Sequence, residues 1–288
     1  MGKGLPTIRL SLSLLLFGAP AFSQEEPRPK EFNTAFMEST FRIEGPNRKF
    51  GTAFLMGRPI PNSQSRSRIV LVTAAHVLED IEGEIAILFL RKKSEKGGWE
   101  RLPVTLKIRD GSRHLWVRHP DADVAAMYIR IPDGVIEGVF PEELFANEET
   151  LAKYEIHPGD ELYSLGYPLG AEANLAGFPI LRSGKIASYP LLPIKETKTF
   201  LLDFNVFPGN SGGPVYLAST NRAYGGAVHI GTTYLVMGLV SRERSVVQQT
   251  AILDEVRQRK FSLGLAEIVH ASLIKETLQL LPPPAPLP

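Results

Sequence analysis

The segment Pro208-Gly-Asn-Ser-Gly-Gly-Pro214 places Ser211 among glycines, which suits a nucleophile. A reactive hydroxyl stands on a tight turn that a substrate carbonyl can approach, and glycines allow both because they lack Cβ atoms and tolerate positive φ. Such a turn also directs backbone N–H groups at one point, so we expect those of Gly209 and Ser211 to form an oxyanion hole. An ordinary glycine-rich turn is the alternative. However, the full seven-residue segment is far less likely to occur by chance than a short Gly-x-Ser-x-Gly-like match.

A histidine follows directly on a buried-strand pattern in Val70-Leu-Val-Thr-Ala-Ala-His-Val77. The small residues Ala74 and Ala75 leave room for the imidazole of His76 beside another group. A neutral imidazole with a pKa of about 6.5 can take a proton from serine and return it to a leaving amine. Taken alone, this segment fits a structural histidine as well as a general base. Together with the serine segment, it favours His76 as the general base.

Two aspartates compete for the third position in His119-Pro-Asp-Ala-Asp-Val-Ala-Ala-Met127. Asp123 directly precedes an apolar strand, where a buried carboxylate can fix the histidine tautomer and stabilise the imidazolium. Asp121 lies further out in the polar loop and is expected to be a solvated turn residue. The three segments together predict acyl transfer to water, with Ser211 as nucleophile, His76 as base and Asp123 orienting it.

Short strands rich in β-branched and aromatic residues, separated by turns, are expected to position these groups. In the first half they are residues 50–56, 68–73, 84–90 and 124–130. In the second half they are residues 160–166, 184–188, 199–203, 213–217 and 234–240. Residues 141–153 read as a connection with some helix. Two such blocks of short strands indicate an all-β protein with two barrels side by side.

These segments resemble the trypsin/chymotrypsin-like serine peptidase clan, whose members carry histidine, aspartate and serine in this chain order. The resemblance covers roughly residues 40–245. It implies two antiparallel six-stranded β-barrels and an endopeptidase that acts on protein or peptide substrates through an acyl-enzyme, without a cofactor.

Within the clan, the chain is most similar to bacterial HtrA/Deg-type protease domains. The similar stretches are Gly51-Thr-Ala-Phe54, Leu165-Gly-Tyr-Pro-Leu-Gly170, Ser183-Gly-Lys-Ile-Ala-Ser188 and Asp203. Two departures limit what is carried over. Asn210 stands where digestive-type members have an aspartate that pairs with a newly cut N-terminus, so no activation cleavage is implied. We expect no PDZ domain after the protease domain, so neither cage assembly nor regulation by a C-terminal peptide is carried over.

The side-chain specificity pocket is placed by the same resemblance. Its walls are expected from Asn205, Val206, Leu239 and Ser241. None of these is acidic, so a strong preference for Lys or Arg is not implied, and a small or medium apolar side chain is expected. His229 could recognise an acidic side chain, although a loop histidine is the more ordinary reading. His114, His119, His157 and His270 lack the spacing of metal ligands, so no metal site is expected.

The N-terminus has the layout of a cleavable secretory signal. Lys3 and Arg9 precede the apolar stretch Leu10-Ser-Leu-Ser-Leu-Leu-Leu-Phe17, and small residues at Ala21 and Ser23 suit a signal peptidase. The apolar run is about half of the roughly 20 residues that a membrane anchor needs. We therefore expect an exported protein, periplasmic or secreted, with no membrane contact after cleavage.

The predicted organisation follows from these elements. It comprises a signal peptide over 1–23, a flexible lead-in over 24–35, a protease domain over 36–280 and a proline-rich tail over 281–288. Within the domain, the first barrel spans 36–140, the second spans 155–245, and a C-terminal helical extension spans 246–280. The apolar spacing of Leu265, Ile268, Val269 and Leu273 favours helix in this extension.

Composition excludes several function classes. A formal net charge of +1 gives no global attraction to nucleic acid or an anionic membrane. The absence of cysteine removes disulfides, thiolate metal sites and a cysteine nucleophile. A protease-fold binding module without useful turnover and an esterase for small substrates remain as alternatives, because the same residues would serve each. The pattern leaves the oligomeric state open.

Overall fold

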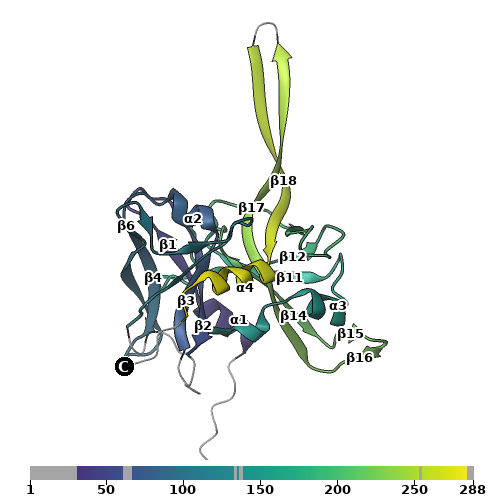
Figure 1. The fold of residues 1–288 in the computed structure, drawn as a ribbon, viewed down its shortest axis with the longest axis horizontal. Helices are drawn as coiled ribbons and strands as arrows, with labels where there is room; N and C mark the ends of the chain where they lie inside the picture. The colour runs from purple at the N-terminus through teal and green to yellow at the C-terminus, as the bar shows by residue number, and fades with distance from the viewer. Residues whose placement is uncertain (1–30, 61–66, 133–134, 136–138, 253–254, 284–288) are drawn as a thin grey trace, which may run out of the picture. The chain divides into compact units, whose positions relative to one another are not determined.

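The structure is a computed structural model that describes residues 31–60, 67–132, 135, 139–252 and 255–283 (Figure 1). The predicted signal peptide and the end of the proline-rich tail lie outside the described residues. The chain enters through helix α1 (Phe32–Glu38), whose first N–H groups are capped by the carboxylate of Glu31. The last residues of the predicted flexible lead-in are therefore helical, because a side-chain cap satisfies the free donors of the first turn.

The first half of the chain forms an eight-stranded sheet, in the order β5-β4-β1-β2-β3-β9-β8 with β10 added beside β2. Its strands are β1 (Thr40–Glu44), β2 (Phe50–Pro59), β3 (Ser67–Thr73), β4 (Ile85–Lys93), β5 (Trp99–Lys107), β8 (Val117–Arg118), β9 (Ala125–Tyr128) and β10 (Phe140–Pro141). All neighbours are antiparallel except β10 and β2, which run parallel.

This sheet does not close, so the expectation of two closed barrels is not met in the first half. Closure would require β5 to pair with β8, and β8 has only two residues. The chain between them instead forms a small hairpin from β6 (Arg109–Asp110) and β7 (Arg113–His114). A two-residue strand supplies too few ladder hydrogen bonds to join the two edges.

The second half forms the closed six-stranded barrel that was expected, in the order β11-β12-β13-β18-β17-β14. Its strands are β11 (Glu161–Gly166), β12 (Ile180–Ile186), β13 (Thr199–Asp203), β14 (Pro214–Thr220), β17 (Thr232–Ile252) and β18 (Glu255–His270). Alternate side chains point inward, as in β13, where Phe200 and Leu202 are buried. A side hairpin of β15 (Ala223–Tyr224) and β16 (Ala227–Val228) lies between β14 and β17.

The predicted helical extension over 246–280 is wrong for most of its length. Residues 246–252 and 255–270 belong to β17 and β18, and β18 completes the barrel by pairing with β13. Ala266 and Ile268 are buried, two residues apart, as expected for one face of a strand. The β-branched residues Ile268 and Val269 also favour a strand over a helix. Only Ala271–Leu280 is helical, as α4.

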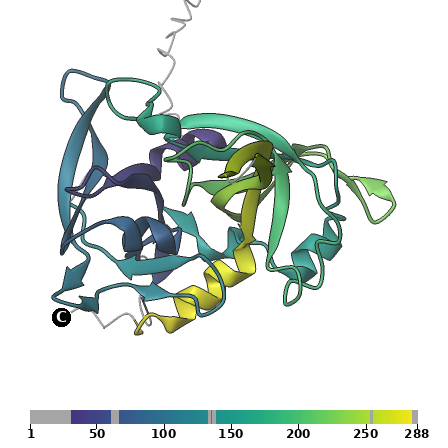
Figure 2. The same cartoon turned by 90° about the horizontal axis from the view of Figure 1, so that it is seen from above.

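Helix α4 leaves the end of β18 and contacts β8 and β9 of the first sheet (Figures 1 and 2). After it, the carbonyl of Leu281 accepts from Arg58 and that of Pro282 accepts from Tyr128. The connection between the halves carries a 3-10 turn (Glu142–Leu144) and helix α3 (Glu148–Lys153), in agreement with the partly helical connection that was expected. No helix in the described part of the chain has the length and apolar character needed to cross a membrane.

Candidate active site

His76 and Asp123 come from neighbouring ends of two paired strands. β3 ends at Thr73 and helix α2 (Ala75–Asp80) begins at once, which places His76 in its first turn. Asp123 lies just before β9, and β9 pairs with β3. The His76 Nδ1 atom lies 2.7 Å from Asp123 Oδ2, and the His76 backbone N–H donates to Oδ1 at 3.0 Å. The carboxylate therefore fixes both the ring and the main chain of His76.

The same contacts set the charge of both groups. Burial alone would raise the pKa of Asp123, but the hydrogen bond and charge of His76, with the Ser241 hydroxyl, hold that pKa far below its ordinary value. Burial disfavours the imidazolium, yet the hydrogen bond and charge of Asp123 raise the pKa of His76 above its ordinary value. Because Nδ1 faces a carboxylate, the neutral ring carries its proton there and leaves Nε2 as the acceptor.

Ser211 joins this group through Ser241. The Ser241 hydroxyl donates to Asp123 Oδ2 at 2.6 Å, and the Ser241 carbonyl accepts from Ser211 Oγ at 2.9 Å. The Ser211 hydroxyl therefore points at a carbonyl rather than at the imidazole. Rotation about one side-chain bond redirects a serine hydroxyl, and hydrogen bonds of this kind often form only with substrate bound.

The turn before Ser211 exposes two N–H groups. Gly209 has φ +98°, and a Cβ there would lie 2.1 Å from the carbonyl oxygen of Tyr167. Among the described residues, nothing accepts from the N–H of Gly209 or of Ser211, whereas Asn210 N–H donates to the Phe207 carbonyl. The turn thus leaves free the two donors that were predicted to bind an oxyanion.

Two residues that the sequence analysis did not select hold this turn. Thr52 of β2 donates its hydroxyl to the Gly209 carbonyl at 2.6 Å and its N–H to the Ser211 carbonyl at 2.9 Å. Leu169 donates its N–H to the Pro208 carbonyl at 2.7 Å. In a trans peptide the N–H points away from the C=O, so the Leu169 contact turns the Gly209 N–H away from Leu169.

Leu169 is in the left-handed region at φ 54° although it is not glycine. Its side chain is 69% exposed, so packing does not compensate the strain. Backbone strain in an unpacked residue is an observation that points to function. The only signal in the sequence was the motif Leu165–Gly170, which marks a turn without giving its conformation.

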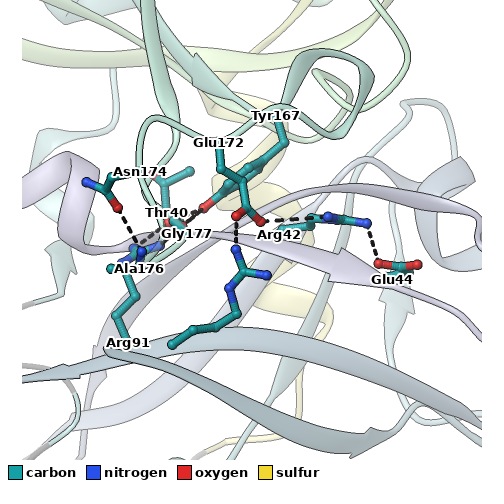
Figure 3. Close-up of polar contacts among 10 residues, drawn as sticks. Thr40, Arg42, Glu44, Arg91, Tyr167, Glu172, Asn174, Ala176 and Gly177 are labelled. Carbon is teal, nitrogen blue, oxygen red and sulfur yellow. Dashed lines mark hydrogen bonds and ion pairs between the residues drawn. The ribbon is translucent and has the colours of Figure 1, made fainter. Parts of the chain in front are cut away.

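A buried arginine supports the other side of that turn (Figure 3). The guanidinium of Arg91 donates to the Tyr167 hydroxyl at 3.2 Å and lies 4.3 Å from the ring centroids of Phe41 and Phe178. It also donates to the backbone carbonyls of Met37, Glu38, Thr40 and Gly177. Arg91 thereby ties α1 and β1 to the segment that follows Tyr167.

Ser211 and His76 share a pocket of about 310 Å³. The other residues that line it are Arg48, Lys49, Phe50, Val77, Asp80, Pro208 and Gly209. The pocket lies where the first sheet meets the Ser211 turn, so a group held there is within reach of both the hydroxyl and the imidazole.

The four residues expected to form the specificity pocket do not line this space. Leu239 is fully buried in the barrel and Val206 is largely buried, while Asn205 is exposed. Ser241 is buried with its hydroxyl on Asp123. Strand alternation explains the difference at Leu239, because its side chain points to the interior of the closed barrel.

The remaining candidates lie apart from this group. Asp121 forms an ion pair with Lys198 at 3.1 Å, as a turn residue rather than a partner of His76. His229 stacks on Tyr224 at 3.6 Å in the side hairpin. Burial lowers the pKa of His270 to about 4. In the part of the chain that the structure describes, no three His, Asp or Glu side chains gather as metal ligands would.

Three comparisons with known proteins were made. Residues 51–225 match the model of the trypsin-like peptidase domain. A comparison with curated proteins finds no match. Among solved structures, the chain is similar to a thermostable serine protease, AL20, from an extremophilic microorganism. The identity is 14%, the match covers 84% of this chain and 96% of that chain, and the TM-score is 0.45.

Proposed function

The chain belongs to the trypsin-like peptidase domain family, and from that premise we propose that it is a serine endopeptidase acting through Ser211, His76 and Asp123. Family membership supports a serine peptidase with protein substrates. The finer assignment to these three residues rests on their chemistry and contacts.

The proposed reaction begins when the Ser211 hydroxyl turns from the Ser241 carbonyl to His76 Nε2. Its oxygen bonds to the substrate carbonyl carbon while its proton passes to Nε2, and Asp123 stabilises the imidazolium. The N–H groups of Gly209 and Ser211 hold the oxyanion. The imidazolium then protonates the leaving amine as the C–N bond breaks, and water hydrolyses the acyl-enzyme with His76 as base.

The observation that carries this proposal is the contact of one residue, Ser241, with both Ser211 and Asp123. It ties the serine hydroxyl to the carboxylate that holds His76, although the three residues are far apart in the chain. A purely structural histidine would not need an adjacent serine beside two unpaired N–H groups.

Hydrolysis of unfolded casein and of a p-nitrophenyl ester tests the proposal. We expect Ser211→Ala to lose at least about 10³-fold in kcat on both substrates, because the covalent route disappears. Ser219→Ala, at the far end of β14, is the matched control and should behave as wild type. Equal activity of wild type and Ser211→Ala would refute the assignment.

A second candidate is a binding module with the protease fold. One observation favours it, since the Ser211 hydroxyl is bonded to a carbonyl rather than to the imidazole. In that case Ser211→Ala would bind unfolded polypeptides as wild type does, and neither would cleave them. Hydrolysis of the ester but not of casein would instead indicate an esterase.

We also propose that the protein is exported to the periplasm or the medium, because residues 1–23 have the layout of a signal peptide. The likeness to HtrA/Deg-type domains, and the roles of Asn205, Val206, Leu239 and Ser241 in side-chain recognition, remain predictions. A cleavage profile on a peptide library tests the preference for a small or medium apolar side chain.

A further inference from the structure

Strands β17 and β18 extend beyond the barrel as a two-stranded hairpin, which we call the arm and define as residues 242–252 and 255–265 (Figure 1). Strand β14 pairs with β17 only as far as Leu239, and Val240 makes the last contacts, with Gly212 and Gly213. Among the described residues, β17 has no strand neighbour but β18 from Arg242 onward. Both outer edges of the arm are therefore unpaired among the described residues, that of β17 from Arg242 onward and that of β18 before Leu265.

The free edge of β17 starts at the nucleophile. The carbonyl of Ser241 faces Ser211, which donates to it at 2.9 Å. The pairing of β17 with β18 is irregular between Val240 and Arg242, and beyond this point alternate residues of β17 are expected to turn their N–H and C=O groups to the free edge. An unpaired edge of this kind is a template for another extended chain.

The arm also presents apolar side chains to solvent. Val246 and Phe261 are paired across the arm and are 51% and 42% exposed. Val247 and Leu263 are 53% and 48% exposed. A two-stranded hairpin is only marginally stable in water by itself, so contact with a further chain would stabilise it.

At the base of the arm, Arg242 and Arg244 share the carboxylate of Glu267, at 3.8 Å and 3.5 Å. Beyond this base, residues 245–252 of β17 carry no charged side chain. The free edge of β17 therefore selects by apolar contact and main-chain pairing more than by charge. An unfolded polypeptide with apolar residues has both properties, since its main chain is free to pair and its side chains are exposed.

We propose that the part of the arm beyond Ser245 is an additional docking surface for the unfolded polypeptide being cleaved, which continues as a strand along the free edge of β17. This proposal rests on the proposed function, because its occupant is the substrate of that site. An antiparallel strand is favoured slightly over a parallel one. The substrate then runs toward Ser211, and its residues on the N-terminal side of the cleaved bond lie along the arm.

Continuity with Ser211 is the reason to choose this occupant over a second copy of the chain. A segment paired from Val247 back to Ser241 is delivered directly to the nucleophile. At about 3.3 Å per residue this edge spans about 20 Å, or about six substrate residues. We therefore expect efficiency to rise with substrate length over about six residues before the cleaved bond.

The test compares the wild type with an arm-shortened variant, in which residues 246–261 are replaced by Asn-Gly. Ser245 and Ser262 are directly opposite each other, so a two-residue turn can join them. We expect the variant to cleave a short ester within about twofold of wild type. On long apolar peptides and casein we expect kcat/KM to fall at least about tenfold, mainly through KM. A milder variant, Val246→Thr with Phe261→Thr, should reproduce part of this loss without altering the hairpin.

Equal cleavage of long substrates by the wild type and both variants would overturn the proposal, as would an equal loss on the short ester. If the wild type cleaves nothing, the proposed function fails, and the arm is tested separately in Ser211→Ala. A labelled apolar peptide of about twelve residues should then bind at least about tenfold more tightly with the arm than without it. Sedimentation that shows an arm-dependent dimer with unchanged peptide binding would assign the arm to self-association and refute the proposal.

Discussion

The conformation of Leu169 gives a sharp prediction about the turn that aims the Gly209 N–H. Leu169 is left-handed, and its N–H donates to the Pro208 carbonyl. Its exposed side chain allows substitution without loss of packing. Leu169→Ile keeps the size but makes the left-handed conformation harder to adopt, because the side chain becomes β-branched. Leu169→Gly removes the strain.

The magnitude follows from the backbone. A left-handed conformation costs an L-residue about 1–2 kcal/mol relative to glycine. An additional penalty of similar size in Leu169→Ile lowers the ratio of the correct turn to its alternatives by about 5- to 30-fold. Complete loss of one oxyanion donor, which costs about 10²–10³ in rate, is the upper limit. We therefore expect kcat to fall about 5- to 30-fold in Leu169→Ile and to stay at or above the wild-type value in Leu169→Gly.

The assay measures kcat and KM on a short peptide, together with the inhibition constant of a matching peptide aldehyde. The aldehyde forms a tetrahedral adduct, so its inhibition constant should rise by the factor by which kcat/KM falls. KM should change little, because the turn acts on the oxyanion rather than on the ground-state substrate. The reasoning is refuted if Leu169→Ile keeps full kcat, or if Leu169→Gly is as impaired as Leu169→Ile.

Three further predictions concern the groups around this turn. The rate should fall as the pH drops through the raised pKa of His76, because protonated Nε2 cannot accept a proton. Asp123→Asn removes the charge that raises this pKa, so it should shift the acid limb of the pH–rate profile to lower pH and reduce kcat about 10⁴-fold. A pH–rate profile of each protein measures both effects. Thr52→Val should leave the Gly209 carbonyl with only the 3.4 Å hydrogen bond from the Tyr167 N–H. We expect kcat to fall by up to about tenfold, because a hydrogen bond of this kind contributes about 0.5–1.5 kcal/mol; unchanged kinetics would contradict this. Arg91→Met should lower the free energy of unfolding in urea by more than about 3 kcal/mol, because several buried carbonyls lose their donor. Arg91→Lys should not restore the stability of the wild type. A urea midpoint equal to that of the wild type in either variant would count against the role of Arg91.

Local patterns predicted the strands well where alternation and β-branched residues agree. The strand expected over 199–203 is β13 with the same bounds, and Ser211, His76 and Asp123 all follow or precede predicted strands. Two of the three, His76 and Asp123, are in direct contact. This agreement reflects short-range rules, since a strand that ends in a small-residue turn is visible in a few residues.

Long-range pairing was not predictable in the same way. Leu265, Ile268 and Val269 have spacings that fit a helix or a buried strand, and only pairing with β13 decides for the strand. Closure of the first sheet likewise depends on how many residues β8 contributes.

Hydrogen bonds from main-chain and short polar groups were missed for the same reason. The sequence placed Ser241 in a pocket wall, whereas its hydroxyl donates to Asp123. The left-handed turn at Leu169 depends on a contact with Pro208, a residue distant in the chain.

Mass spectrometry after treatment with a fluorophosphonate tests the central claim most directly. We expect one adduct on the wild type, mapped to Ser211, with labelling abolished in Ser211→Ala and greatly slowed in His76→Ala. Ser241→Ala should still be labelled, because it lacks only a donor to Asp123. An adduct on another residue, or equal labelling of wild type and Ser211→Ala, would contradict the account.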